Sequence, residues 1–342
     1  MIYKKSVKKR FLDRLGGTED WDKHLLESIA KDENSHHFKI AQKILKEQED
    51  FGNVTNSYLG REMWYSNDFF INSLILNFIT DAEDDLVNEL KKIYVGVLGN
   101  PGLDAEAINM DDEFEGYLIK THFDIDIQLD LFSHFVSYHL YGMQLSDERA
   151  RFNLLPEMCE KLLLLMDKEA LLKKAILEDV HDDLEVDIKS PRLNIATDLF
   201  VAGMSFILGH EIGHHFLKHT ESNGRNLVSK FIPTDVTYNQ RYLDEFAADD
   251  FGFNLLIRGM KKRNDNTLFA PLIVILMLAL YDKHPEEASQ YHPSLRDRYL
   301  NLLSRVSEHN EAIALTLQRI FNDIATWINH TLLGYWKTEW WK

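Results

Sequence analysis

The longest regular pattern of apolar residues lies in the middle of the chain, at residues 194–220. Apolar side chains cover almost every side of this segment in a helical projection, which predicts a buried helix. Thr197 or Asp198 is the expected N-cap, because such side chains accept an unpaired backbone N–H. The glycine-containing stretch 221–224 predicts the end of the helix. We therefore expect one buried central helix in the fold.

The N-terminal side of the chain mixes helical and extended patterns. Residues 68–92 predict a helix in two pieces, and residues 93–97 predict a short strand. Apolar residues alternate with Asp and Gln towards the end of residues 117–131, which predicts a half-buried strand. Residues 184–188 alternate in the same way. These segments predict a minor β component.

The remaining apolar patterns are helical. Helices are expected at residues 154–177 and 238–258, a further one is expected to open at Pro271, and another to start near residue 291. The last residues contain three tryptophans, which we expect to dock on the body of the same chain. The predicted fold class is therefore mainly α with a minor β component (α+β).

Three polar residues interrupt the apolar central helix in the pattern His-Glu-x-x-His: His210, Glu211 and His214. Residues four apart share a helix face, so two imidazoles at this spacing can bind one Zn²⁺ at about 2.0–2.1 Å. Glu211 lies about 100° round the helix, where it can reach a water on the metal and act as a base. Gly209 and Gly213 leave room beside these side chains for substrate or for a second helix.

A catalytic zinc site needs a third protein ligand. Glu245 lies on the next expected helix and can supply it. Asp249 follows one turn later and can accept the free N–H of a ligand histidine, with Asp244 and Asp250 as alternatives. The two small alanines that follow Phe246 favour close packing of the two helices.

Glu245 and Asp249 form a second motif, Glu-x-x-Ala-Asp. A third motif, His-Pro-x-x-x-x-Arg, occupies residues 292–298. The three motifs together resemble those of the gluzincin zinc metallopeptidases, especially the catalytic core of the CAAX-prenyl-protease and HtpX-like peptidases. The resemblance covers about residues 195–305. Lit-like phage-exclusion peptidases are similar more loosely, through the same zinc motif.

The resemblance implies a role for each matched residue. One Zn²⁺ per chain would be bound by His210, His214 and Glu245, with Glu211 as general base. Asp249 would support a ligand histidine. Two further site residues, His292 and Arg298, would line the cleft and support the substrate or the metal helices.

Composition excludes several other classes of protein. The net charge of −17 argues against a nucleic-acid partner, because such proteins present basic patches. Cys159 is the only cysteine, which excludes an intrachain disulfide and fits a reducing compartment. The N-terminus lacks the apolar core of a signal peptide, and the apolar run 268–280 is too short to span a bilayer. We expect a cytoplasmic protein without stable membrane insertion.

The predicted function is that of a zinc-dependent endopeptidase acting on a protein or peptide. The donor that stabilises the oxyanion is left open among four residues: His292, Arg298, Tyr242 and Tyr238. The alternative is a non-catalytic, zinc-stabilised regulatory or binding protein that retains a peptidase fold. Glu211 argues against that alternative, since a purely structural site has no use for a base.

The length of the chain suggests two regions, a mainly helical accessory region at residues 1–180 and the peptidase region at residues 181–342. We expect cleavage to be selective for one or a few protein substrates. Residues 221–237 could form a lid beside the site, and residues 184–188 could pair with an extended substrate.

Overall fold

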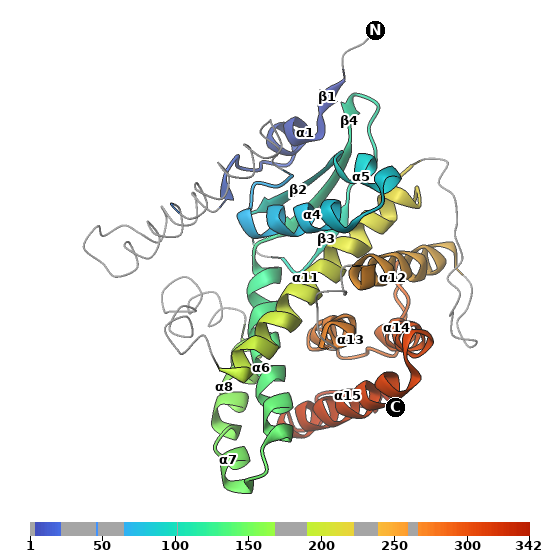
Figure 1. Ribbon diagram of the computed structural model, residues 1–342. Helices are drawn as coiled ribbons and strands as arrows, with labels where there is room; N and C mark the ends of the chain where they lie inside the picture. Colours follow the sequence, from blue (N-terminus) through green and yellow to red (C-terminus); the bar gives the residue numbers. More distant parts are fainter. Residues whose placement is uncertain are drawn as a thin grey trace. The chain divides into compact units, whose positions relative to one another are not determined.

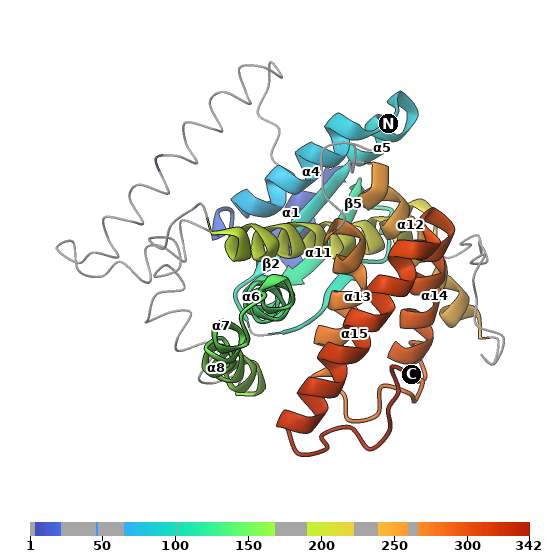
Figure 2. The same ribbon diagram turned by 60° about the horizontal axis from the view of Figure 1, so that its bottom comes forward.

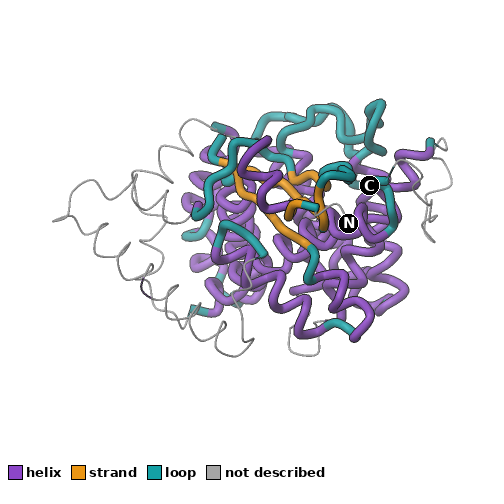
Figure 3. Tube along the Cα trace, turned by 90° about the horizontal axis from the view of Figure 1, so that it is seen from above, coloured by secondary structure: helices purple, strands orange, loops and turns teal. Residues whose placement is uncertain are grey.

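The computed structural model describes residues 4–21, 46, 65–100, 102–167, 190–221, 239–258 and 266–342 (Figure 1). The chain forms two compact units, Met1–Ile125 and Asp126–Lys342. The division expected near residue 180 remains a prediction, because residues 168–189 lie outside the described ranges. The fold class predicted from the sequence, mainly α with a minor β component, is confirmed (Figure 3).

A small sheet forms the first unit's centre. Strand β2 (Ile93–Leu98) pairs in parallel with β5 (Tyr117–His122), and β3 (Ala105–Ala107) pairs antiparallel with the other side of β5. Two shorter strands, β1 (Lys5–Ser6) and β4 (Phe114–Glu115), form a separate parallel pair. The strand expected at residues 93–97 is confirmed.

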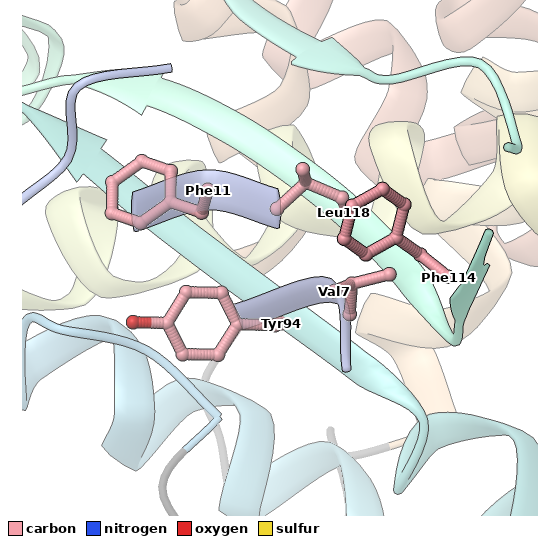
Figure 4. Packing of buried hydrophobic residues seen from close by; sticks show 5 residues of the cluster. All are labelled: Val7, Phe11, Tyr94, Phe114 and Leu118. Carbon is pink, nitrogen blue, oxygen red and sulfur yellow. The ribbon is translucent and has the colours of Figure 1, made fainter. Parts of the chain in front are cut away.

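Three helices complete the described part of the first unit: α1 (Val7–Arg14), α4 (Phe69–Asp81) and α5 (Asp84–Leu90). The last two confirm the expected helix in two pieces. Side chains from α1 and three strands form a buried cluster, which Figure 4 shows: Val7, Phe11, Tyr94, Phe114 and Leu118.

The strand predicted over residues 117–131 is wrong beyond residue 122. The backbone turns there into helix α6 (Asp124–Gln144). The alternation of apolar and polar residues continues through the first turns of this helix. The buried residues of the whole helix nevertheless follow helical spacing, as Ile125, Leu129, Phe132 and Val136 show. The helical spacing becomes visible only when residues beyond 131 are included.

Helices are the regular elements of the second unit's described residues, which contain no strand. This unit contains most of α6 and seven further helices: α7 (Glu148–Phe152), α8 (Leu155–Met166), α11 (Pro191–Phe216), α12 (Gln240–Arg258), α13 (Asn266–Ala279), α14 (Leu295–His309) and α15 (Glu311–Thr331). Helix α11 packs against α12 and α13, and Figure 2 shows α13, α14 and α15 side by side.

Two expected helix starts are wrong. Helix α11 begins at Pro191 with Ser190 as N-cap residue, so neither Thr197 nor Asp198 caps it. Proline is favoured in the first turn, and the helix is extended because its early residues are also buried. Helix α13 begins at Asn266 and contains Pro271 inside it, where burial of the surrounding apolar residues outweighs the lost backbone hydrogen bond.

The C-terminal tryptophans dock on the second unit, as expected. Trp336, Trp340 and Trp341 are all buried. The indole N–H of Trp336 donates to the carbonyl of Ala279 at 2.9 Å, at the end of α13. This polar contact fixes the position of an otherwise apolar cluster.

Helix α11 is the one helix among the described residues that is long and apolar enough to cross a membrane. Its most apolar window is 72% buried inside the structure. The core helix of a folded unit passes the same test of length and composition, and burial of this kind accounts for the apolar sequence.

Small residues bring α11 and α12 close together. A Cβ atom added to Gly209 would lie 3.0 Å from the Cα of Gly252, and one added to Gly213 would lie 3.2 Å from the Cα of Ala248. A Cβ added to Gly252 would lie 2.8 Å from the backbone nitrogen of His210. The second helix therefore takes the space that the glycines leave.

Replacing Gly252 by alanine should destabilise the second unit. The added methyl group meets backbone atoms rather than a flexible side chain, and overpacking of this kind costs about 1–3 kcal/mol. Gly142→Ala in α6 is the matched control, because its Cβ would meet only Leu154 Cδ1 at 3.5 Å. The control should be stabilised by about 0.5–1 kcal/mol. Urea denaturation measures both, and a Gly252→Ala protein as stable as wild type would contradict the account.

Candidate metal centre

Three potential ligands converge where α11 faces α12. His210 and His214 lie on α11 and Glu245 on α12, and their ligand atoms lie within 4.8 Å of one another. The two Nε2 atoms are 3.1 Å apart. Each Nε2 atom is 3.5 Å from an oxygen of Glu245. This buried group could bind a metal ion.

The distances fit a tetrahedral ion. Two ligand atoms about 2.0–2.1 Å from one ion, at a tetrahedral angle, lie about 3.3 Å apart. The two Nε2 atoms lie 3.1 Å apart, and each lies 3.5 Å from a different oxygen of Glu245, which are distances close to that value.

Asp249 lies behind His210, where the sequence placed it. The Nδ1–H of His210 donates to Asp249 Oδ1 at 2.8 Å. This hydrogen bond holds the hydrogen on Nδ1 and directs Nε2 at the other two ligand atoms. Asp249 is fully buried, and the guanidinium of Arg298 donates to both of its carboxylate oxygens at 2.7 and 2.9 Å.

Glu211 does not join the ligand group. Its carboxylate oxygen lies 4.0 Å from His210 Nε2, and the residue is almost completely buried. It therefore lies beside the group, within reach of a small molecule bound there.

The residues of the His-Pro…Arg motif occupy two different places. His292 has 62% of its side chain exposed, and its Nδ1 lies 3.4 Å from Glu245 Oε1. Ser289 holds the loop, because its Oγ accepts the backbone N–H of His292 at 2.9 Å. Arg298 comes from α14 and has 12% of its side chain exposed, beside the buried carboxylate of Asp249.

Sequence reasoning missed one residue of the site, His219. Its Nδ1 lies 3.0 Å from Nδ1 of His214, the ligand five residues earlier. Its neighbour in space is Asp244, 3.6 Å from its Nε2. Asp250, the other alternative to Asp249, accepts a hydrogen bond from Asn301.

A family model described as Peptidase U49 matches residues 150–318. The match spans α11, α12 and α14, and therefore every residue of the ligand group and its supports. Comparison with curated proteins and with solved structures gives no match. The family match supports a peptidase.

Charges around the ligand group shift several pKa values. Burial alone would lower the pKa of His210, but its hydrogen bonds to Asp249 and Glu245 raise it to about 10. Burial and the charge of His210 lower the pKa of His214 to about 3. Burial would raise the pKa of Glu245, yet contacts with His210, His292 and Arg298 hold it well below its usual range. Without a metal, one proton is therefore held on His210.

The metal-free protein should lose stability as pH rises from about 6.5 towards 10. An unfolded histidine titrates near 6.5, whereas His210 in the folded chain titrates near 10. Between these values the folded state binds one more proton than the unfolded state. The contribution of His210 to the free energy of unfolding is therefore complete below pH 6.5 and is lost progressively as the pH rises towards 10. The free energy of unfolding should fall by up to about 1.4 kcal/mol per pH unit, the value for one proton.

Urea denaturation in the presence of a chelator, at several pH values from 7 to 9, measures this slope. Asp249→Asn is the comparison, because it removes the carboxylate whose hydrogen bond raises the pKa of His210. The slope should be smaller in that variant. Equal slopes in the two proteins would show that His210 does not hold the proton.

Proposed function

We propose that this chain is a zinc-dependent endopeptidase, in which His210, His214 and Glu245 bind one Zn²⁺. The observation that carries the proposal is the convergence of two imidazole nitrogens and one carboxylate, whose ligand atoms lie within 4.8 Å of one another. Nitrogen and oxygen ligands of this kind, three in number, are typical of catalytic zinc sites, which keep one position for water or substrate. The peptidase family match supports the same reading.

A bound zinc ion supplies a Lewis acid that polarises the scissile carbonyl and makes water more acidic. Glu211 is the general base in the proposal. It takes the proton from the attacking water and delivers it to the amine that leaves, a role worth about 10²–10⁴-fold in rate. Its position beside His210, outside the ligand group, supports this role.

Of the four candidates for the oxyanion donor, we favour His292. The hydroxyl of Tyr242 already donates to the carbonyl of Ser289 at 2.6 Å. Two of the donor nitrogens of Arg298 are bound to Asp249. His292 is exposed beside Glu245, and its ring N–H can reach a group bound there. Tyr238 lies outside the described residues.

Selective cleavage of one or a few protein substrates is part of the proposal and rests on the sequence. The expected edge strand at residues 184–188 and residues 222–237 of the expected lid lie outside the described ranges. A cytoplasmic location and the absence of membrane insertion likewise remain predictions from composition and sequence. The alternative, a zinc-stabilised binding protein without turnover, uses the same ligands but gives Glu211 no function.

Glu211→Gln should retain zinc and lose cleavage. The amide has nearly the shape of the carboxylate but cannot accept the proton, so cleavage should fall about 10²–10⁴-fold. Zinc content by elemental analysis should stay at about one per chain, as expected for this ligand set. Mapping of new N-termini after incubation with a peptide library and a cell lysate measures cleavage.

Glu157→Gln is the matched control, because Glu157 is an exposed glutamate on α8 and is not one of the predicted site residues. It should cleave like wild type. Near-normal cleavage by Glu211→Gln would remove Glu211 from the mechanism. Zinc-loaded wild-type protein that cleaves no substrate in either assay would favour the binding-protein alternative.

A further inference from the structure

The end of α11 reverses the chain sharply. Lys218 has a positive φ of 67°. The N–H of Lys218 donates to the carbonyl of His215 at 3.0 Å, and the N–H of His219 donates to that of His214 at 2.8 Å. These two bonds form a Schellman motif, in which glycine is the usual residue at the left-handed position. The motif brings His219 back against the last ligand of the helix.

The ring of His219 lies between His214 and α12. Its Nδ1 is 3.0 Å from His214 Nδ1, and the two rings meet edge to face at an interplanar angle of 68°. Its Nε2 lies 3.6 Å from Oδ1 of Asp244, which is too long for a hydrogen bond but close enough for the charge of the carboxylate to act on the ring, and only 4% of its side chain is exposed. Gln240 donates a hydrogen bond to the same oxygen of Asp244 at 2.9 Å. Two histidines and one carboxylate thus lie next to one another in a row across the two helices.

The carboxylate at one end of this row indicates which ring nitrogen of each histidine carries a hydrogen. The negative charge of Asp244, 3.6 Å from Nε2, favours the tautomer of the neutral His219 ring that has its hydrogen on Nε2 and its lone pair on Nδ1. Among the described residues, the hydrogen bond recorded for that nitrogen is the one with Nδ1 of His214, which must then carry a hydrogen. Nε2 of His214 is left with its lone pair, directed at Nε2 of His210 and at Glu245.

We propose that His219, oriented by Asp244, is a positioning residue that holds the His214 ring and its tautomer ready for metal binding. The proposal rests on the zinc site described above. His210 is hydrogen-bonded directly to a carboxylate, whereas His214 is hydrogen-bonded to a second imidazole that lies beside a carboxylate. His219 itself does not contact the metal or the substrate.

Zinc affinity tests the role, measured on the full chain by competition with a chromophoric chelator. His219→Leu fills the space but removes the acceptor, and zinc affinity should fall about 10–100-fold, as for other residues that orient a ligand. His219→Asn should restore most of the affinity, because its side-chain oxygen can accept from His214 and its amide can donate to Asp244. Lys218→Gly is the matched control: it keeps the left-handed turn and should bind zinc like wild type.

A second measurement does not depend on the metal. In the metal-free wild-type protein labelled with ¹⁵N-histidine, the His214 ring should show its hydrogen on Nδ1, with His214→Gln used to assign the signal. In His219→Leu this preference should be lost. A hydrogen on Nε2 of His214 in the wild type, or a His219→Leu protein with wild-type zinc affinity, would overturn the proposal. If the wild type binds no zinc, the proposed function fails, and the tautomer still decides the role of His219.

Discussion

The site depends on how closely α11 and α12 approach each other. Helices with ordinary side chains at their contact pack 8–10 Å apart, and small residues permit the shortest of these distances. Gly209, Gly213 and Gly252 leave no room for a Cβ atom between the two backbones. At this separation the short side chain of Asp249 reaches the ring of His210, and Glu245 reaches both Nε2 atoms. The same contact that fills the core therefore sets the ligand geometry.

Close packing also buries charge, and the charges are paired. Asp249 and Glu245 are two carboxylates with little access to water. Arg298 supplies one positive charge, and in the metal-free protein the proton on His210 supplies the second. Burying an unpaired charge is costly. In the metal-free protein the proton on His210 therefore supplies the positive charge that a metal cation would supply. Metal binding should accordingly displace a proton, as it does wherever the ligands must be neutral.

The sequence predicts those parts of the site that depend on helical spacing alone. His210 and His214 are four residues apart, as are Glu245 and Asp249, and the structure brings the three ligand residues together with Asp249 behind them. His219 could not be found in this way, since its contact depends on a left-handed residue that is lysine and not glycine. The start of α6 was misread because its first residues alternate with a period of two. The buried residues of the whole segment follow helical spacing, and their burial favours a helix over a strand there.

The most direct test of the account is X-ray absorption at the zinc edge of the full chain loaded with one Zn²⁺. The account predicts a first shell of nitrogen and oxygen atoms at about 2.0–2.2 Å, with outer-shell scattering from two imidazole rings. A sulfur atom at about 2.3 Å, or a shell of oxygen atoms without imidazole scattering, would contradict it.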